Sequence, residues 1–145
     1  MVEIHIETGG SRPVISRAFI LTLLLSLLAG CQSLSERKQA DSLQEILRNY
    51  EAVIRWGSID QARRFQSPDR QSETVAPVPR DLRVTHYEVV QGPSMLGPQQ
   101  AVQAALVQYV FEDSQVVREL VDRQTWEYVP ESQSWYLVSP LPEFK

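Results

Sequence analysis

Residues 41–57, DSLQEILRNYEAVIRWG, carry the clearest structural signal in the chain. Apolar side chains recur there at spacings of three and four, as one face of an α-helix requires: Leu43, Ile46, Leu47, Tyr50, Val53 and Ile54. Charged side chains occupy the other face, where Glu51 and Arg55 form a favourable pair four residues apart. Asp41 is a suitable N-cap and Gly57 a suitable stop. The pattern predicts an amphipathic helix between these two residues.

A second, shorter helix is expected directly after Gly57. Ser58-Ile59-Asp60-Gln61 fits a capping box, a serine followed three residues later by glutamine. The helix is expected to continue through Phe65 and to end at Ser67-Pro68. Residues 69–79 are polar and contain proline, so they are predicted to form a loop.

After Pro79 the apolar period changes to two, the period of a β-strand. Leu82, Val84 and His86 are therefore expected on one strand face, with Tyr87 on the other. The pattern predicts four strands, at residues 82–90, 101–111, 115–129 and 135–138.

The connections between these strands have turn chemistry. Residues 91–99 contain two Gly-Pro pairs and are predicted to be a loop. Glu112-Asp113-Ser114 and residues 130–134 are predicted turns. Residues 101–111 also fit a helical period, and we prefer a strand because a hairpin turn follows.

The predicted fold class is α+β: an N-terminal helix and a short second helix packed on a curved antiparallel meander of about four strands. The order of elements and the aromatic hairpin from Trp126 to Trp135 resemble the nuclear transport factor 2-like superfamily, also called cystatin-like. The resemblance covers residues 41–138. It implies a curved sheet that wraps the N-terminal helix and often leaves a cone-shaped pocket.

An uncharged, leucine-rich run at residues 18–28 precedes this domain. Arg12 and Arg17 come before the run and the small pair Ala29-Gly30 follows it, which is the order of a secretory signal peptide. The run is several residues shorter than the roughly 20 apolar residues that cross a bilayer. The sequence therefore predicts a cleaved signal rather than a permanent membrane span.

The residues Leu28-Ala29-Gly30-Cys31 resemble the lipobox of bacterial lipoproteins. The resemblance implies cleavage between Gly30 and Cys31 and a diacylglyceryl group on the Cys31 thiol. The expected organisation is a signal peptide at 1–30, a lipidated cysteine and tether at 31–40, and a single domain at 41–145. An alternative translation start near Val14 is a further hypothesis, because acidic residues are unusual so early in a signal.

Composition excludes several classes of function. The formal net charge is −4, with basic and acidic residues interspersed, and nucleic-acid binding needs a basic stripe. Cys31 is the only cysteine, so no disulfide can form within the chain. His86 is the only histidine after residue 31, which leaves a histidine-based metal site without partners. We expect no metal and no cofactor.

Two residues are weak catalytic candidates, Asp122 and His86. Asp122 shares a strand face with Arg118, Gln124 and Trp126. If that face is concave, burial would raise the pKa of the Asp122 carboxyl, as in a general base. The alternative, which we prefer, is that this face is solvated and that Val117, Val121 and Thr125 point inward.

Aromatic residues are numerous for a small domain, and cross-strand packing explains most of them: Trp56, Trp126, Trp135, Tyr109, Tyr128 and Tyr136. Candidates for a pocket or an interface are Trp126, Tyr109, Arg118 and Trp135, because tryptophan, tyrosine and arginine favour binding surfaces.

The sequence therefore predicts a lipid-anchored lipoprotein of the bacterial cell envelope, facing the periplasm. In the lipoproteins that the chain resembles, aspartate after the cysteine is typical of those kept at the inner membrane, so Gln32 favours the outer membrane if the source is Gram-negative. The expected role is non-catalytic, either small-ligand binding or docking to an envelope protein. The alternative is a pocket acid–base enzyme of the isomerase or hydratase type. Membrane lipid is the expected partner of Cys31, and neither nucleic acid nor metal is expected.

Overall fold

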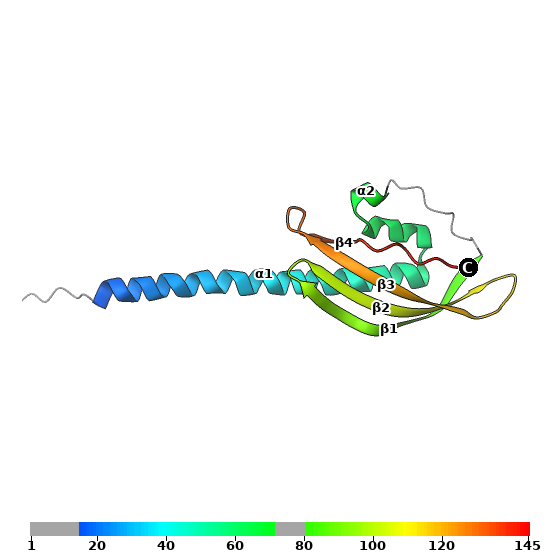
Figure 1. Ribbon diagram of the computed structural model, residues 1–145, viewed down its shortest axis with the longest axis horizontal. Helices are drawn as coiled ribbons and strands as arrows, with labels where there is room; N and C mark the ends of the chain where they lie inside the picture. The colour runs from blue at the N-terminus through cyan, green and yellow to red at the C-terminus, as the bar shows by residue number, and fades with distance from the viewer. Residues whose placement is uncertain (1–14, 72–80) are drawn as a thin grey trace, which may run out of the picture. The chain divides into compact units, whose positions relative to one another are not determined.

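The computed structural model describes residues 15–71 and 81–145 (Figure 1). The chain divides into two compact units, residues 1–38 and residues 39–145. The second unit contains the sheet and the core. In this unit the C-terminal part of the long helix lies against one face of the sheet (Figure 1).

Helix α1 runs from Ile15 to Trp56. The helix predicted at residues 41–57 is confirmed, and it ends directly before Gly57, whose N–H donates to the carbonyl of Val53 at 2.9 Å. Asp41 as an N-cap is wrong, because the helix passes through it without a break. The physical reason is that residues 35–40, SERKQA, contain mostly good helix formers and no Gly or Pro that would stop the helix.

The second predicted helix exists as a 3₁₀ helix, η1, at Ile59–Phe65. The capping box is wrong: the Ser58 side chain makes no capping hydrogen bond, and the first turn is closed by the Gln61 N–H on the Ser58 carbonyl at 2.8 Å. Pro68 does not open a loop at once, because it begins a one-turn helix, α2, at Pro68–Gln71. Proline suits that first helical position, since its missing N–H would have no partner there.

Four antiparallel strands form one sheet in the order β1-β2-β3-β4, which confirms the α+β meander. Their bounds are β1 Leu82–Gly97, β2 Gln100–Phe111, β3 Arg118–Val129 and β4 Ser134–Leu137. The strand interpretation of residues 101–111 is confirmed. The predicted turns are also present, closed by Ser114 N–H on the Phe111 carbonyl and by Gln133 N–H on the Pro130 carbonyl, both at 3.2 Å.

The predicted loop at residues 91–99 is wrong, because β1 continues through it to Gly97. The pairing of β1 with β2 shifts register at four places, three of them between Val89 and Gly97. Such bulges allow a strand at the edge of a sheet to contain proline and glycine. Strand β3 starts later than predicted, at Arg118 instead of Gln115, which has a left-handed φ of 51°.

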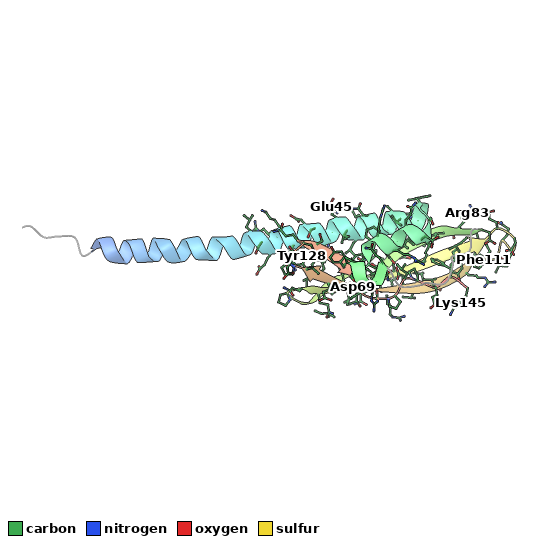
Figure 2. The ribbon with its side chains drawn as sticks, turned by 90° about the horizontal axis from the view of Figure 1, so that it is seen from above. Glu45, Asp69, Arg83, Phe111, Tyr128 and Lys145 are labelled. Carbon is green, nitrogen blue, oxygen red and sulfur yellow. The ribbon has the colours of Figure 1, made fainter. Side chains whose placement is uncertain are left out.

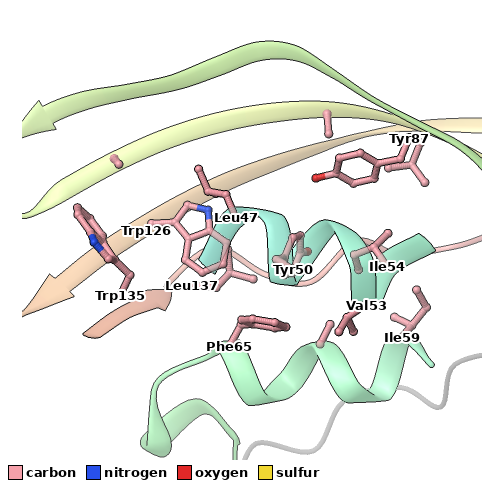
Figure 3. Packing of buried hydrophobic residues seen from close by; sticks show 14 of the residues in the cluster. Leu47, Tyr50, Val53, Ile54, Ile59, Phe65, Tyr87, Trp126, Trp135 and Leu137 are labelled. Carbon is pink, nitrogen blue, oxygen red and sulfur yellow. The ribbon is translucent and has the colours of Figure 1, made fainter. Parts of the chain in front are cut away.

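The core lies between α1 and the inner face of the sheet, and η1 covers the other side of α1 (Figure 3). Tyr50 stands at its centre and meets Phe65 and Trp126 edge-on, with ring centroids 5.4 and 5.5 Å apart. Edge-to-face packing of this kind is favourable beyond the buried area alone. Aromatic rings therefore occupy the centre of the core.

Candidate functional site

The inner face of β3 is polar at two positions and buried at both. Asp122 is 3% exposed, and Gln124 and Trp126 are buried on the same face. Val121, from the opposite face, is exposed instead. The preferred interpretation of the sequence, with Asp122 solvated and Val121 inward, is therefore wrong. The aromatic side chain of Trp126 is the largest on this strand, and its burial decides which face points inward.

The side-chain amide of Gln124 is the centre of a buried hydrogen-bond network. Its Nε2 donates to Asp122 Oδ2 and to the Tyr87 hydroxyl, both at 2.9 Å. Its Oε1 accepts from Trp126 Nε1 at 3.2 Å and from Gln103 Nε2 at 3.4 Å. The amide therefore uses both donors and both lone pairs.

The Tyr50 hydroxyl joins the network from α1, because it donates to Asp122 Oδ2 at 3.1 Å. The same oxygen thus accepts from the helix and from Gln124. Tyr87 comes from β1 and Gln103 from β2, so one helix and three strands meet at these side chains. In Figure 3 the Tyr87 ring lies between α1 and the sheet.

Burial changes the acid–base chemistry of this network. It raises the pKa of Asp122 from 3.8 to about 6, although the hydrogen bonds from Gln124 and Tyr50 oppose the shift. Burial also raises the pKa of Tyr50, and the nearby Asp122 charge adds to that rise. Burial is also the main cause of the raised pKa of Tyr87. Both phenols therefore remain neutral at physiological pH, Tyr50 as a donor to Asp122 and Tyr87 as an acceptor from Gln124.

The second catalytic candidate does not share this site. His86 is exposed, and its Nε2 lies 3.6 Å from Glu88 Oε2. A register shift between Val84 and His86 reverses the alternation, so Tyr87 points inward and His86 outward. The expectation that Val84 and His86 share a face is therefore wrong, since a bulge inserts one residue into the strand.

The aromatic candidates are mainly structural. Trp135 is buried and its Nε1 donates to the Gln39 carbonyl at 3.1 Å. Tyr109 is buried against Phe144, and its hydroxyl donates to the Lys145 carbonyl at 2.8 Å. Arg118 is exposed and its guanidinium donates to the same carbonyl at 2.6 Å. Tyr109 and Arg118 thus fix the C-terminal segment to the sheet.

Trp56, which the sequence places among the aromatic residues but not among the interface candidates, is the most exposed of the three tryptophans. Trp56 ends α1 with 77% of its surface exposed, and the Arg55 guanidinium lies 4.9 Å from its ring centroid. It borders a hollow of about 700 Å³. The hollow is lined by Ile54, Ile59 and Asp60 from the helical side and by residues 82–85 of β1. None of the network residues lies among these lining residues.

The signal for Trp56 was present in the sequence. The apolar positions of the helix face end at Ile54, and Trp56 falls on the charged face two residues later. A large aromatic residue outside the apolar stripe is expected on the surface.

The predicted lipidation and cleavage sites, at Gly30 and Cys31, belong to the first unit, residues 1–38. Gly30 and Cys31 fall within the bounds of α1, but the structure describes side chains only from Leu34 onward. Arg12 and the early acidic residues of the signal lie outside the described residues. Among residues 34–71 and 81–145, whose side chains the structure describes, no helix has the length and apolar character needed to cross a membrane. The same ranges contain no cluster of three or more His, Cys, Asp or Glu placed to hold a metal ion.

Comparison of the chain with protein-family models, with curated proteins and with solved structures finds no match.

Proposed function

We propose that this chain is a bacterial lipoprotein, acylated at Cys31, whose domain works by docking to an envelope protein rather than by catalysis. The anchoring part rests on Leu28-Ala29-Gly30-Cys31 directly after the apolar run. Two or three acyl chains hold a protein firmly on a bilayer, whereas one holds it only reversibly. Gln32 after the cysteine favours the outer membrane, with the domain in the periplasm.

The buried network favours a binding role over an enzymatic one. A general base must come within about 2.6–3.2 Å of the proton it removes. Asp122 is closed off in the core, and its Oδ2 already accepts from Tyr50 and Gln124. His86 lies on the other face of the sheet. This arrangement supports a structural role for Asp122. The proposed likeness to the superfamily therefore concerns the layout of helix and sheet and does not extend to a catalytic acid.

The observation that carries the docking proposal is the exposed Trp56 indole beside the hollow. Tryptophan and arginine dominate the energetic centres of protein interfaces. Here both occur together, because Arg55 stacks on Trp56, and Ile54 and Ile59 supply apolar surface next to them. We assign the partner contact to this surface, which we call the Trp56 surface: Arg55, Trp56 and the hollow lined by residues 82–85.

Anchoring is tested by growing cells with labelled palmitate. Wild-type protein is expected to incorporate the label and to stay with the membrane after a carbonate wash. The Cys31→Ser variant is expected to lose the label completely, because no other thiol exists in the chain. Label-free wild-type protein in the soluble fraction would contradict the anchoring proposal.

Docking is tested by placing a photo-crosslinking residue at position 56 of the full chain in cells. We expect one adduct of defined mass at this position and none at position 117, which is also exposed. Thr85 is exposed and lines the hollow, so Thr85→Arg is expected to abolish the adduct without unfolding the domain. An adduct that survives Thr85→Arg, or that forms equally at position 117, would argue against this surface.

The hollow itself favours a second candidate, a small ligand, because its volume falls in the range of about 300–1,000 Å³ typical of ligand sites. In that case mass spectrometry of the purified protein would release a molecule that Thr85→Arg excludes. No protein adduct would then form at position 56.

A further inference from the structure

The β1–β2 hairpin contains no charged residue from Val89 to Phe111, in a chain that has 14 basic and 18 acidic residues. The end of this hairpin also exposes two large apolar side chains, those of Met95 and Leu96, and Val90 is exposed farther from the turn. We call Met95 and Leu96 the hairpin tip. Single exposed apolar residues are ordinary on a protein surface, but an uncharged segment that presents several of them is a feature of interaction sites.

Leu96 is the extra residue at a register shift of β1, because Met95 pairs with Ala101 and Gly97 with Gln100. Such bulges re-aim side chains at the edge of a sheet. Both apolar side chains are exposed, Met95 at 51% and Leu96 at 62%.

Hydrogen bonds fix the hairpin end to the beginning of the second unit. The Gln39 side-chain amide donates to the Pro98 carbonyl. The Gln39 carbonyl accepts from Trp135 Nε1, and the Gln99 carbonyl accepts from the Tyr128 N–H at 2.7 Å. The hairpin end is therefore held where the chain enters the domain from its N-terminal side.

Chain length keeps this end of the domain close to the proposed anchor. Cys31 precedes Gln39 by only eight residues. Eight residues span about 12 Å as a helix and at most about 29 Å when extended. If Cys31 carries lipid, Gln39 and the hairpin end bound to it cannot move farther than this from the bilayer surface.

We propose that the hairpin tip inserts into the interfacial region of the bilayer that holds the acylated Cys31. The inference rests on the proposed acylation and adds a second, non-covalent contact that orients the domain. Insertion of Met95 and Leu96 buries apolar area without removing a charge from water. Since residues 89–111 of the hairpin contain no basic residue, the contact does not depend on anionic lipid.

The charge in the neighbouring β3–β4 turn is compatible with a contact made by the uncharged β1–β2 hairpin alone. The β3–β4 turn lies at the same end of the sheet, because Gln100 pairs with Glu127 and the turn follows Val129. It carries Glu131, which is exposed, so the proposed contact leaves this charge in water. The contact is therefore confined to the β1–β2 hairpin.

A peptide adding to the edge of β1 would be the other use of this strand. Edge pairing needs a regular row of N–H and C=O groups. Here β1 has four register shifts, and Pro93 has no N–H to donate. Bulges and proline are features with which proteins block edge pairing, so the edge of β1 is a poor template for a partner strand.

The test uses the full, acylated chain in vesicles of zwitterionic phospholipid, with a fluorophore on Leu96→Cys. Acylation occupies Cys31, so the new thiol is the only reactive one. The matched control is Val117→Cys, because Val117 is 61% exposed and Leu96 62%. Val117 follows the other end of β2, a strand of 12 residues that separates the two sites by about 36 Å.

We expect a lipid-borne, short-range quencher to reduce the Leu96→Cys signal at least threefold more than the Val117→Cys signal. Vesicles with added anionic lipid should give the same ratio of quenching between the two positions. Detergent micelles that contain no quencher lipid should show no difference between them. Met95→Cys serves as a second site in the hairpin tip and is expected to behave like Leu96→Cys.

Equal quenching at positions 96 and 117, in chains that float with the vesicles, would overturn the tip contact and leave the anchoring proposal standing. Chains that do not float and react with maleimide at Cys31 would instead overturn the anchoring proposal. A photo-crosslinker at position 96 that gives protein adducts and no lipid adducts in cells would also overturn the lipid assignment.

Discussion

Most half-buried strands bury apolar side chains and expose polar ones. Strand β3 does the reverse at several positions. The inner face buries a carboxylate and an amide, Asp122 and Gln124. The outer face exposes Val121, with 42% of its surface accessible, opposite the half-buried Leu106 on β2. The difference teaches that polarity alone does not decide which face of a strand points inward.

Area explains the choice. Trp126 lies on the same face as Asp122 and Gln124, and an aromatic side chain buries about 150–250 Å². At about 25 cal/mol per Å² this is worth about 4–6 kcal/mol, against about 1.5–3 kcal/mol for a valine. Because side chains two residues apart share a face, burial of Trp126 takes Gln124 and Asp122 inside with it. The hydrogen bonds centred on Gln124 then offset the cost of burying them.

The largest effect is expected from removing that indole. Trp126→Ala should lower the free energy of unfolding by about 3–5 kcal/mol, because the ring contacts with Tyr50 and Phe65 are lost. A domain of this size is stable by about 5–15 kcal/mol in total, so the variant will be marginal. The measurement is urea unfolding of the acylated chain in micelles, followed by circular dichroism.

Trp56→Ala is the matched control, since the same side chain is removed at a site that is 77% exposed. A loss of about 1 kcal/mol or less is expected there, including the exposed contact with Arg55. Similar losses at both tryptophans would mean that burial of Trp126 does not set the orientation of β3.

The next effect concerns the charge on the inner face. The folded-state pKa of Asp122 is about 6, above its ordinary 3.8, so the native state binds the proton more tightly than the unfolded chain does. Stability from this group is therefore fully present below pH 3.8 and is lost as pH rises through 6. The shift corresponds to about 3 kcal/mol.

Asp122→Asn is expected to be more stable than wild type at pH 7, by up to about 3 kcal/mol. The amide has no charge to bury and keeps one oxygen that can accept from Tyr50 and Gln124. The advantage should disappear near pH 4, which urea titrations at pH 4 to 8 will measure. Glu127→Gln, an exposed site on the same strand, should change stability by about 0.5 kcal/mol or less. A destabilised Asp122→Asn at pH 7 would indicate that the ionised carboxylate stabilises the core.

Much of the fold could be predicted from local patterns. The helix at residues 41–56 has a strong period, and the turns near Asp113 and at residues 130–133 contain the expected residue types. The boundaries of α1 and β1 could not be predicted in the same way. Helix formers before Asp41 allowed α1 to start far upstream, and bulges allowed β1 to pass through Pro93.

The candidate site depended on contacts between distant segments. Tyr50, Tyr87, Gln103 and Gln124 form a network only after the sheet has folded onto the helix. The sequence placed Asp122, Gln124 and Trp126 on one face, and a comparison of buried area would have oriented that face correctly. The register shift after Val84, which turns Tyr87 inward, has no comparable local signal.

The smallest effect comes from replacing valine by threonine on the two faces of the sheet. Val121→Thr keeps a β-branched side chain and places the hydroxyl in water, so stability should change by about 0.5 kcal/mol or less. Val107 lies on the inner face of β2 with 0% of its surface exposed. Val107→Thr brings an extra hydroxyl into the core and should cost about 1–3 kcal/mol. Urea midpoints of the two variants compare the faces directly, because the chemical change is identical. Equal midpoints would mean that the inner face can satisfy another polar group at no cost, and the network around Gln124 would then be one of several that this core could accommodate.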